Sequence, residues 1–184
     1  MKSNGWWTLA AATTLWACST PEGGPLAPDA SDQGALGASG SAVVESASGG
    51  GRMVLEVFGF TIPQVLGFSA RKHADGSASG HIDYRQTFEG ETFHFVATVT
   101  CMEIYDVNRV KYGGVLTQST DPTVPVGDHM WFQSIDNGEG SGSPPDRSTG
   151  SGFGTAEENQ AFCDSPATPR FGPWDVTGNL QVSD

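Results

Sequence analysis

The clearest pattern in the chain is an alternation of side chains between residues 93 and 102. Positions 93, 95, 97, 99 and 101 are Phe, Phe, Ala, Val and Cys, whereas positions 94, 96, 98, 100 and 102 are His, Val, Thr, Thr and Met. A period of two is typical of a β-strand, and the β-branched residues agree with this interpretation. We therefore predict a strand here, with the set from 93 to 101 on one face.

Other segments rich in β-branched and aromatic residues predict further strands. They are RMVLEVFGF (52–60), TIPQVLGFSARKH (61–73), HIDYRQ (81–86), NRVKYGGVLTQS (108–119), HMWFQSI (129–135) and WDVTGNLQVSD (174–184). Asp75-Gly76, Gly90 and Asn137-Gly138 indicate tight turns between strands. Pro63 indicates an edge or an interruption, and Gly113-Gly114 in mid-strand indicates a β-bulge or a sharp bend.

One segment, 155–163 (TAEENQAFC), has a helical signature, because Thr155 and Glu158 form a capping box. It follows a long break rich in Gly, Ser and Pro at 138–154. Seven or eight strands with short connections predict an all-β fold, a small antiparallel barrel or sandwich with one short helix. We favour an up-and-down barrel, because closure removes exposed strand edges.

The beginning of the chain carries a different pattern, an apolar run that ends at a cysteine. Lys2 precedes the mostly apolar stretch Trp6–Ala17. This run fits the core of an export signal and is too short to span a bilayer of about 30 Å. Its end, Leu15 to Cys18 (LWAC), resembles the lipobox of bacterial lipoprotein signal peptides. The resemblance implies cleavage before Cys18 and lipidation of its side chain; an ordinary secretory signal is the alternative.

This resemblance divides the chain into three parts. Residues 1–17 are predicted to be a lipoprotein signal peptide, and 52–184 a barrel-like domain. Residues 18–51 begin with the lipidated cysteine and continue mainly as Gly, Ala, Ser, Pro and Asp. Such a composition predicts a disordered, flexible linker. Ser19, rather than Asp, follows the cysteine, which by the sorting rule of Gram-negative lipoproteins implies the outer membrane.

Charge narrows the choice of partners. The 184 residues carry a formal net charge of −12. Because an acidic surface repels phosphate, we expect no nucleic-acid partner and no adsorption of the body to anionic lipid. The expected contact with the membrane is the N-terminal lipid anchor of an exported envelope protein.

The predicted body resembles a group of uncharacterised bacterial secreted β-domains over most of residues 68–182. The resembling segments are HADGSASG (73–80), VTC (99–101), WFQSIDNGEG (131–140) and PPD (144–146). The resemblance implies a secreted β-fold and no particular activity or cofactor.

Lipidation of Cys18 would leave Cys101 and Cys163 as an even pair, which suits an oxidising compartment. A disulfide between them would close a loop of about 60 residues, worth about 4 kcal/mol in the chain-entropy model. Two separate buried thiols are one alternative. A catalytic thiol is another, although no histidine stands beside either cysteine in the sequence.

The loop after the 129–135 strand is a possible site. Its oxygen-bearing residues are Asp136, Asn137, Glu139 and Asp146. Clustered oxygens can bind calcium, but the EF-hand pattern is absent. The other interpretation is turn chemistry, in which Asp136 caps backbone amides of an exposed loop. We assign no metal or cofactor here.

Other candidates are weaker. Alternation places His81, Asp83 and Arg85 on one face of a strand, either as a polar row in solvent or as a catalytic group. The four histidines lack zinc-type spacing, and no nucleophile elbow or phosphate-binding loop occurs. Five aromatic residues are expected to be core or loop anchors, with a ligand platform as the alternative. They are Trp131, Phe132, Phe153, Phe171 and Trp174.

Three functions fit these features. The first is a lipid-anchored envelope β-domain with a non-catalytic binding or structural role, whose partner is an envelope protein or a ligand. The second is a lipocalin-like barrel that carries a small apolar molecule in its lumen, and the third is a barrel-type enzyme that uses the row at residues 81–85.

Overall fold

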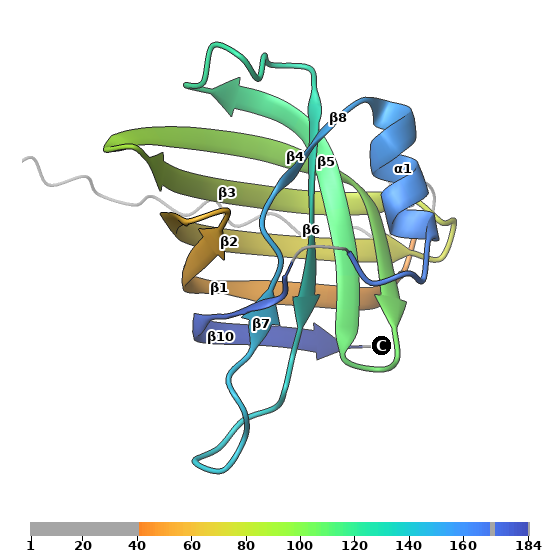
Figure 1. Ribbon diagram of the computed structural model, residues 1–184. Helices are drawn as coiled ribbons and strands as arrows, with labels where there is room; N and C mark the ends of the chain where they lie inside the picture. Colours follow the sequence, from red (N-terminus) through yellow and green to blue (C-terminus); the bar gives the residue numbers. More distant parts are fainter. Residues whose placement is uncertain (1–40, 170–171, 184) are drawn as a thin grey trace, which may run out of the picture. The chain divides into compact units, whose positions relative to one another are not determined.

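The computed structural model describes residues 41–169 and 172–183, and this part is an all-β fold with one short helix (Figure 1). The predicted signal peptide, Cys18 and the first part of the predicted linker lie outside the described residues. The first six strands are β1 (Val43–Val57), β2 (Phe60–His73), β3 (Ala78–Phe88), β4 (Glu91–Tyr105), β5 (Arg109–Ser119) and β6 (His129–Ile135). The remaining elements are β7 (Arg147–Ser148), β8 (Gly152–Gly154), α1 (Ala156–Asp164), β9 (Trp174–Asp175) and β10 (Thr177–Ser183).

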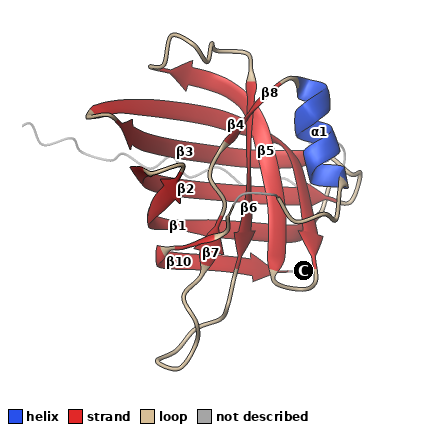
Figure 2. Ribbon diagram, in the orientation of Figure 1, coloured by secondary structure: helices blue, strands red, loops and turns tan. Residues whose placement is uncertain are grey.

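The strands form an antiparallel meander that curls into a nearly closed barrel (Figure 2). Each strand from β1 to β6 pairs with the next, the sheet continues through β7 to β9, and β10 returns to pair with β1. The predicted all-β barrel is therefore confirmed. The structure has more strands than the predicted seven or eight, because the Gly/Ser/Pro-rich break contains β7 and β8 and the closing segment is divided into β9 and β10.

Tight turns connect the early strands. Asp75-Gly76 and Glu89-Gly90 lie in the predicted turns, and both Glu89 (φ 50°) and Gly90 (φ 85°) are left-handed. A turn that was not predicted occurs at Phe58-Gly59, where φ is 53° and 85°. It divides the expected 52–60 strand between β1 and β2, and it shows that a Phe-Gly pair can occupy a hairpin turn that usually contains Asn-Gly.

The boundary predicted for the linker at residue 51 is wrong. Residues 43–51 belong to β1, and Gly49-Gly50-Gly51 are paired with both β2 and β10. A Cβ atom at Gly50 would lie only 2.5 Å from the Leu66 carbonyl oxygen. These glycines are therefore not a flexible spacer but belong to a strand whose backbone lies close to both neighbouring strands.

Aromatic side chains fill the barrel interior. The rings of Phe68 and Tyr112 stack with centroids 4.1 Å apart, and Tyr84 packs edge-on against Phe132 at 5.0 Å. Burial raises the pKa of both tyrosines far above its ordinary value. Their hydroxyl groups are nevertheless satisfied, since Tyr112 contacts Ser134 Oγ and Tyr84 donates to the Gln86 side chain.

A β-bulge changes the face of β4 on which side chains lie. The pairing with β5 shifts register between Val99 and Cys101, opposite the predicted bulge site at Gly113-Gly114. Because one extra residue reverses the alternation, Met102 joins the interior and Cys101 does not. The prediction that Cys101 shares the face of residues 93–99 is therefore wrong.

The reversal places Cys101 next to α1, which packs on the outside of the barrel over β4, β5 and β6 (Figure 1). The predicted helix begins with the expected capping box of Thr155 and Glu158. Cys101 and Cys163 form a disulfide, with the two sulfurs 2.06 Å apart, as the sequence predicted.

A buried lysine holds the end of the same helix. Lys111 is 2% exposed, and its ammonium donates to the carbonyl oxygens of Phe162 and Ser165. The ammonium also lies 4.5 Å from the centroid of the Phe162 ring. Burial lowers the pKa of Lys111 below its ordinary value. Lys111 therefore stabilises the C-terminal end of α1, where the helix dipole favours a cation.

Candidate functional site

The candidate site lies where the barrel closes, between β10 and the loop of residues 136–146. One edge of β10 pairs with β1, whereas the amides of Leu180 and Val182 face away from β1. Asp146 Oδ2 accepts a hydrogen bond from the Leu180 amide at 2.7 Å, and Asp136 Oδ2 accepts one from the Val182 amide at 3.0 Å. Two carboxylates thus take the place that a neighbouring strand would occupy.

The second oxygen of each carboxylate holds the loop itself. Asp136 Oδ1 accepts from the Gly138 amide at 2.7 Å, and Asp146 Oδ1 accepts from the Asn137 amide at 2.8 Å. The Asn137 side chain donates to the Pro145 carbonyl oxygen, which ties the start of the loop to its end. All four carboxylate oxygens are therefore bound to backbone or loop groups, and the loop is fixed to the barrel.

The local sequence explains why the loop adopts this shape. Gly138 has a φ of 81°, a conformation that other residues rarely adopt. Pro144 and Pro145 restrict the backbone immediately before Asp146, which is 7% exposed. The predicted role of Asp136 as a cap for backbone amides is confirmed by its bond to Gly138.

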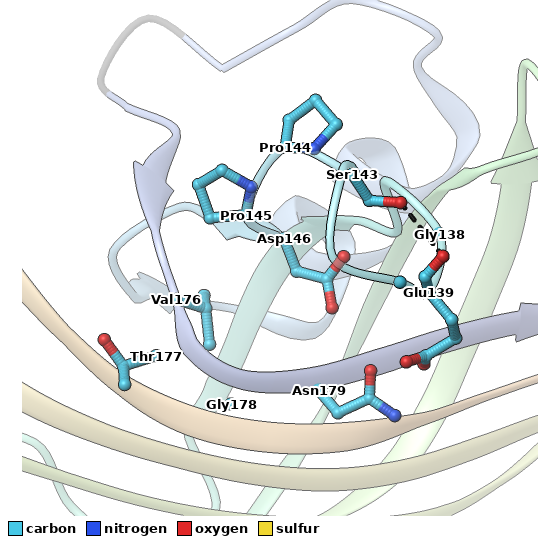
Figure 3. A pocket seen from close by; sticks show the side chains of 11 residues that line it. Gly138, Glu139, Ser143, Pro144, Pro145, Asp146, Val176, Thr177, Gly178 and Asn179 are labelled. Atoms are coloured by element: carbon cyan, nitrogen blue, oxygen red, sulfur yellow. Dashed lines mark hydrogen bonds between the residues drawn. The ribbon is translucent and has the colours of Figure 1, made fainter.

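A pocket of about 420 Å³ opens between this loop and β10 (Figure 3). Its lining comes from residues Gly138–Gly140, Ser143–Asp146 and Val176–Asn179. Figure 3 shows Asn179 on β10 facing the part of the loop that carries Glu139. The Ser143 hydroxyl donates to the Glu139 carbonyl oxygen at 3.0 Å. The pocket therefore presents a carboxylate, an amide and hydroxyl groups from two elements that the carboxylate bonds hold together.

The structure gives no support to a calcium site in this loop. Each oxygen of Asp136 and Asp146 accepts a backbone amide, so backbone contacts account for the position of both carboxylates. Across the described ranges, no group of three or more His, Cys, Asp or Glu residues is placed to hold a metal ion. Of the predicted oxygen donors, Glu139 is the one whose carboxylate faces the pocket without a protein hydrogen bond in the described part.

The row of His81, Asp83 and Arg85 does not form a cleft. His81 and Arg85 are exposed on the outer face of β3, because the interior face carries Ile82 and Tyr84. Asp83 instead pairs with the neighbouring strand, where its carboxylate lies 3.1 Å from His94 Nε2. Asp83 also lies 3.8 Å from Arg85 Nε on its own strand, so the row is a polar row on the outer face, as one of the two interpretations predicted.

Four of the five aromatic residues predicted as core or loop anchors lie in the described part of the chain, and these four pack as anchors. Phe132 is fully buried, Phe153 packs against Phe95 with centroids 5.0 Å apart, and Trp131 stacks on Phe162 at 5.9 Å. Trp174 packs against the core, whereas Phe171 lies outside the described residues.

We compared the chain with protein-family models, with curated proteins and with solved structures, and none of them matches it. Among the helices of residues 41–169 and 172–183, none has both the length and the apolar character that a membrane crossing requires.

Proposed function

We propose that this protein is a lipid-anchored protein of the bacterial cell envelope whose barrel is a non-catalytic binding domain. The observation that carries the binding role is the pocket beside β10, whose loop is fixed by Asp136 and Asp146 before any ligand arrives. A site that is already ordered loses little conformational entropy on binding, which favours affinity.

The lining of the pocket favours a neutral, hydroxyl-rich ligand such as a saccharide. The Glu139 carboxylate can accept hydrogen bonds from hydroxyl groups, and the Asn179 amide can both donate and accept. Pro144 and Pro145 add apolar surface at the rim, suited to the C–H face of a sugar ring. An anionic ligand would be repelled by Glu139 and by the net charge of −12.

The contacts of the carboxylates and of the polar row on β3 favour a binding domain over an enzyme. The carboxylates next to the pocket hold backbone amides, and the polar row on β3 faces solvent. A carrier with an apolar lumen requires an interior cavity, but aromatic rings occupy the middle of this barrel. The proposal therefore places the ligand outside the lumen.

The anchor rests on the sequence. The lipobox-like segment before Cys18 and the Gly/Ala/Ser/Pro-rich residues after it give a lipid attachment followed by a spacer. Two or more acyl chains anchor a protein stably, because each buried methylene contributes about 0.8 kcal/mol. Ser19 favours the outer membrane as the destination.

For the anchor, we expect the full-length chain expressed in a Gram-negative host to be found in the membrane fraction, with Cys18 acylated in the intact mass spectrum. Cys18→Ser is expected to move it to the soluble or unprocessed fraction with no lipid mass. A mature chain that begins after Ala17 and carries no acyl group would contradict the anchor, but it would leave the pocket untouched.

For the pocket, we expect a panel of neutral mono- and disaccharides to include at least one that shifts the NMR amide signals of Gly140, Gly178 and Asn179 in a saturable way. Glu139→Gln and Asn179→Ala should each weaken that binding about tenfold. This factor corresponds to the free energy of one hydrogen bond to a charged or buried group. Glu157→Gln, which removes a charge on α1 outside the pocket, is the matched control. Equal binding by all three variants would refute the assignment of the site.

A further inference from the structure

A second pocket lies at the mouth of the barrel, at the end opposite the start of β1. β1 begins where Val43 pairs with His73, at the end of the barrel that carries the β2–β3 turn. The opposite end carries the β1–β2 turn, the β3–β4 turn and the β5–β6 loop, which Figure 1 shows on one side of the molecule. This pocket has a volume of about 370 Å³.

The strand register explains why these side chains point into the mouth. Phe88 pairs with Glu91 and Gln86 pairs with Phe93, so the four side chains share one face of the β3–β4 hairpin. It is the interior face, because Tyr84 and Phe95 lie on it further along the same strands and are fully buried. The β5–β6 loop closes the other side with the segment 121–123.

The lining combines aromatic rings with carboxylates. Phe88 and Phe93 are half-buried, and Phe60 packs against Phe88 with ring centroids 5.3 Å apart. Glu91 and Asp121 supply the charge, and none of the residues that line this pocket is a Lys, Arg or His. Neither carboxylate forms an ion pair in the described part of the chain.

Only one of the two carboxylates forms hydrogen bonds with the segment 121–123. Asp121 Oδ1 accepts hydrogen bonds from the Thr123 amide and hydroxyl. Glu91 is exposed, and its carboxylate does not bond to either Thr123 group. The mouth therefore offers two carboxylates, of which that of Glu91 has no hydrogen bond within the described residues, and no cation of its own.

We infer that this mouth binds an organic ammonium ion that carries a small apolar body. The face of an aromatic ring attracts a cation, and such contacts strengthen when water is displaced. The carboxylates of Glu91 and Asp121 add Coulombic attraction, and the phenylalanine side chains cover the apolar groups. Barrel mouths are frequent ligand sites, and this volume lies within the range of small-molecule pockets.

The test is a titration of the barrel domain with choline and with 3,3-dimethyl-1-butanol, its uncharged isostere, at constant ionic strength. We expect choline to shift the amide signals of Phe88, Glu91 and Thr123 in a saturable way, with at least tenfold weaker binding of the neutral alcohol. Equal binding of the two probes, or no saturable shift with choline, would overturn the inference.

Variants locate the site. Glu91→Gln should weaken choline binding about threefold or more, and Phe88→Leu about tenfold, because it removes the ring face and keeps an apolar side chain. Glu89→Gln removes the same charge from the adjacent turn outside the pocket and should change binding less than twofold. An equal loss in Glu89→Gln and Glu91→Gln would show that only the overall charge matters and would overturn the inference.

A second titration distinguishes a free ammonium solute from the headgroup of a lipid. Binding of free choline without binding to phosphatidylcholine vesicles would assign a free solute, and binding to both would assign a lipid headgroup. Either result supports the ammonium site. Because the residues that are varied here do not line the pocket beside β10, failure of this site and failure of the saccharide pocket are distinguishable.

Discussion

Asp146→Ala is expected to lower the free energy of unfolding of the barrel by about 3 kcal/mol, since one buried and one partly buried backbone amide each lose their acceptor. The amides are those of Leu180 on β10 and Asn137 in the loop. β10 then keeps its pairing with β1 and, on its other side, the bond from the Val182 amide to Asp136, so the closure of the barrel at the loop is weakened. Urea unfolding of the domain measures the change.

Two further variants separate the role of Asp146 from that of a negative charge in the loop. Asp146→Asn keeps one acceptor oxygen, so it should have about half the effect of the alanine variant. Glu139→Ala removes a carboxylate from the same loop that has no hydrogen bond to the described protein, and a change within about 0.5 kcal/mol is expected. Equal losses in Asp146→Ala and Glu139→Ala would show that the carboxylate of Asp146 has no special structural role.

Removal of the disulfide should have an effect of similar size. The double variant Cys101→Ala/Cys163→Ala is expected to lower the free energy of unfolding by about 4 kcal/mol and Tm by roughly 12 °C. The two cysteines are 62 residues apart, so the reduced unfolded chain gains much conformational freedom. Differential scanning calorimetry with and without a reductant measures the effect.

The reductant provides the control for the packing that the two alanine substitutions also change. Wild-type protein treated with a phosphine reductant should lose a similar amount, whereas the same reductant should leave Tm of the double variant unchanged. Lys111 and Tyr105 still hold α1 in both cases, through carbonyl oxygens at its C-terminal end. A loss below about 1 kcal/mol on reduction would mean that these contacts, and not the crosslink, fix the helix.

The strands and the helix were predictable because their signals are local. The period of two at residues 93–102 and the capping box of Thr155 depend only on near neighbours in the chain. The face of Cys101 was not predictable, because a bulge of one residue reverses the alternation and depends on how β4 meets β5. Composition alone assigns the glycines at 49–51 to the linker, because it does not show that two strands pair with them.

The candidate site was predictable in part for the same reason. The Asp136-Asn137-Gly138 sequence indicates a capped turn, and the turn is present. The partners on β10 lie 34 residues from Asp146 and 46 residues from Asp136, so no local pattern contains them. The barrel mouth likewise joins a hairpin to the segment 121–123, which only the closed sheet brings together.

The central claim is that carboxylates close the barrel and hold the binding loop against β10. Amide hydrogen exchange of Leu180 and Val182 in the wild-type protein tests it most directly, since these two amides have no bond to β1. The account predicts protection comparable to that of amides inside β3 and β4. Exchange within minutes at both positions, while the amides of β10 that are bonded to β1 remain protected, would contradict it.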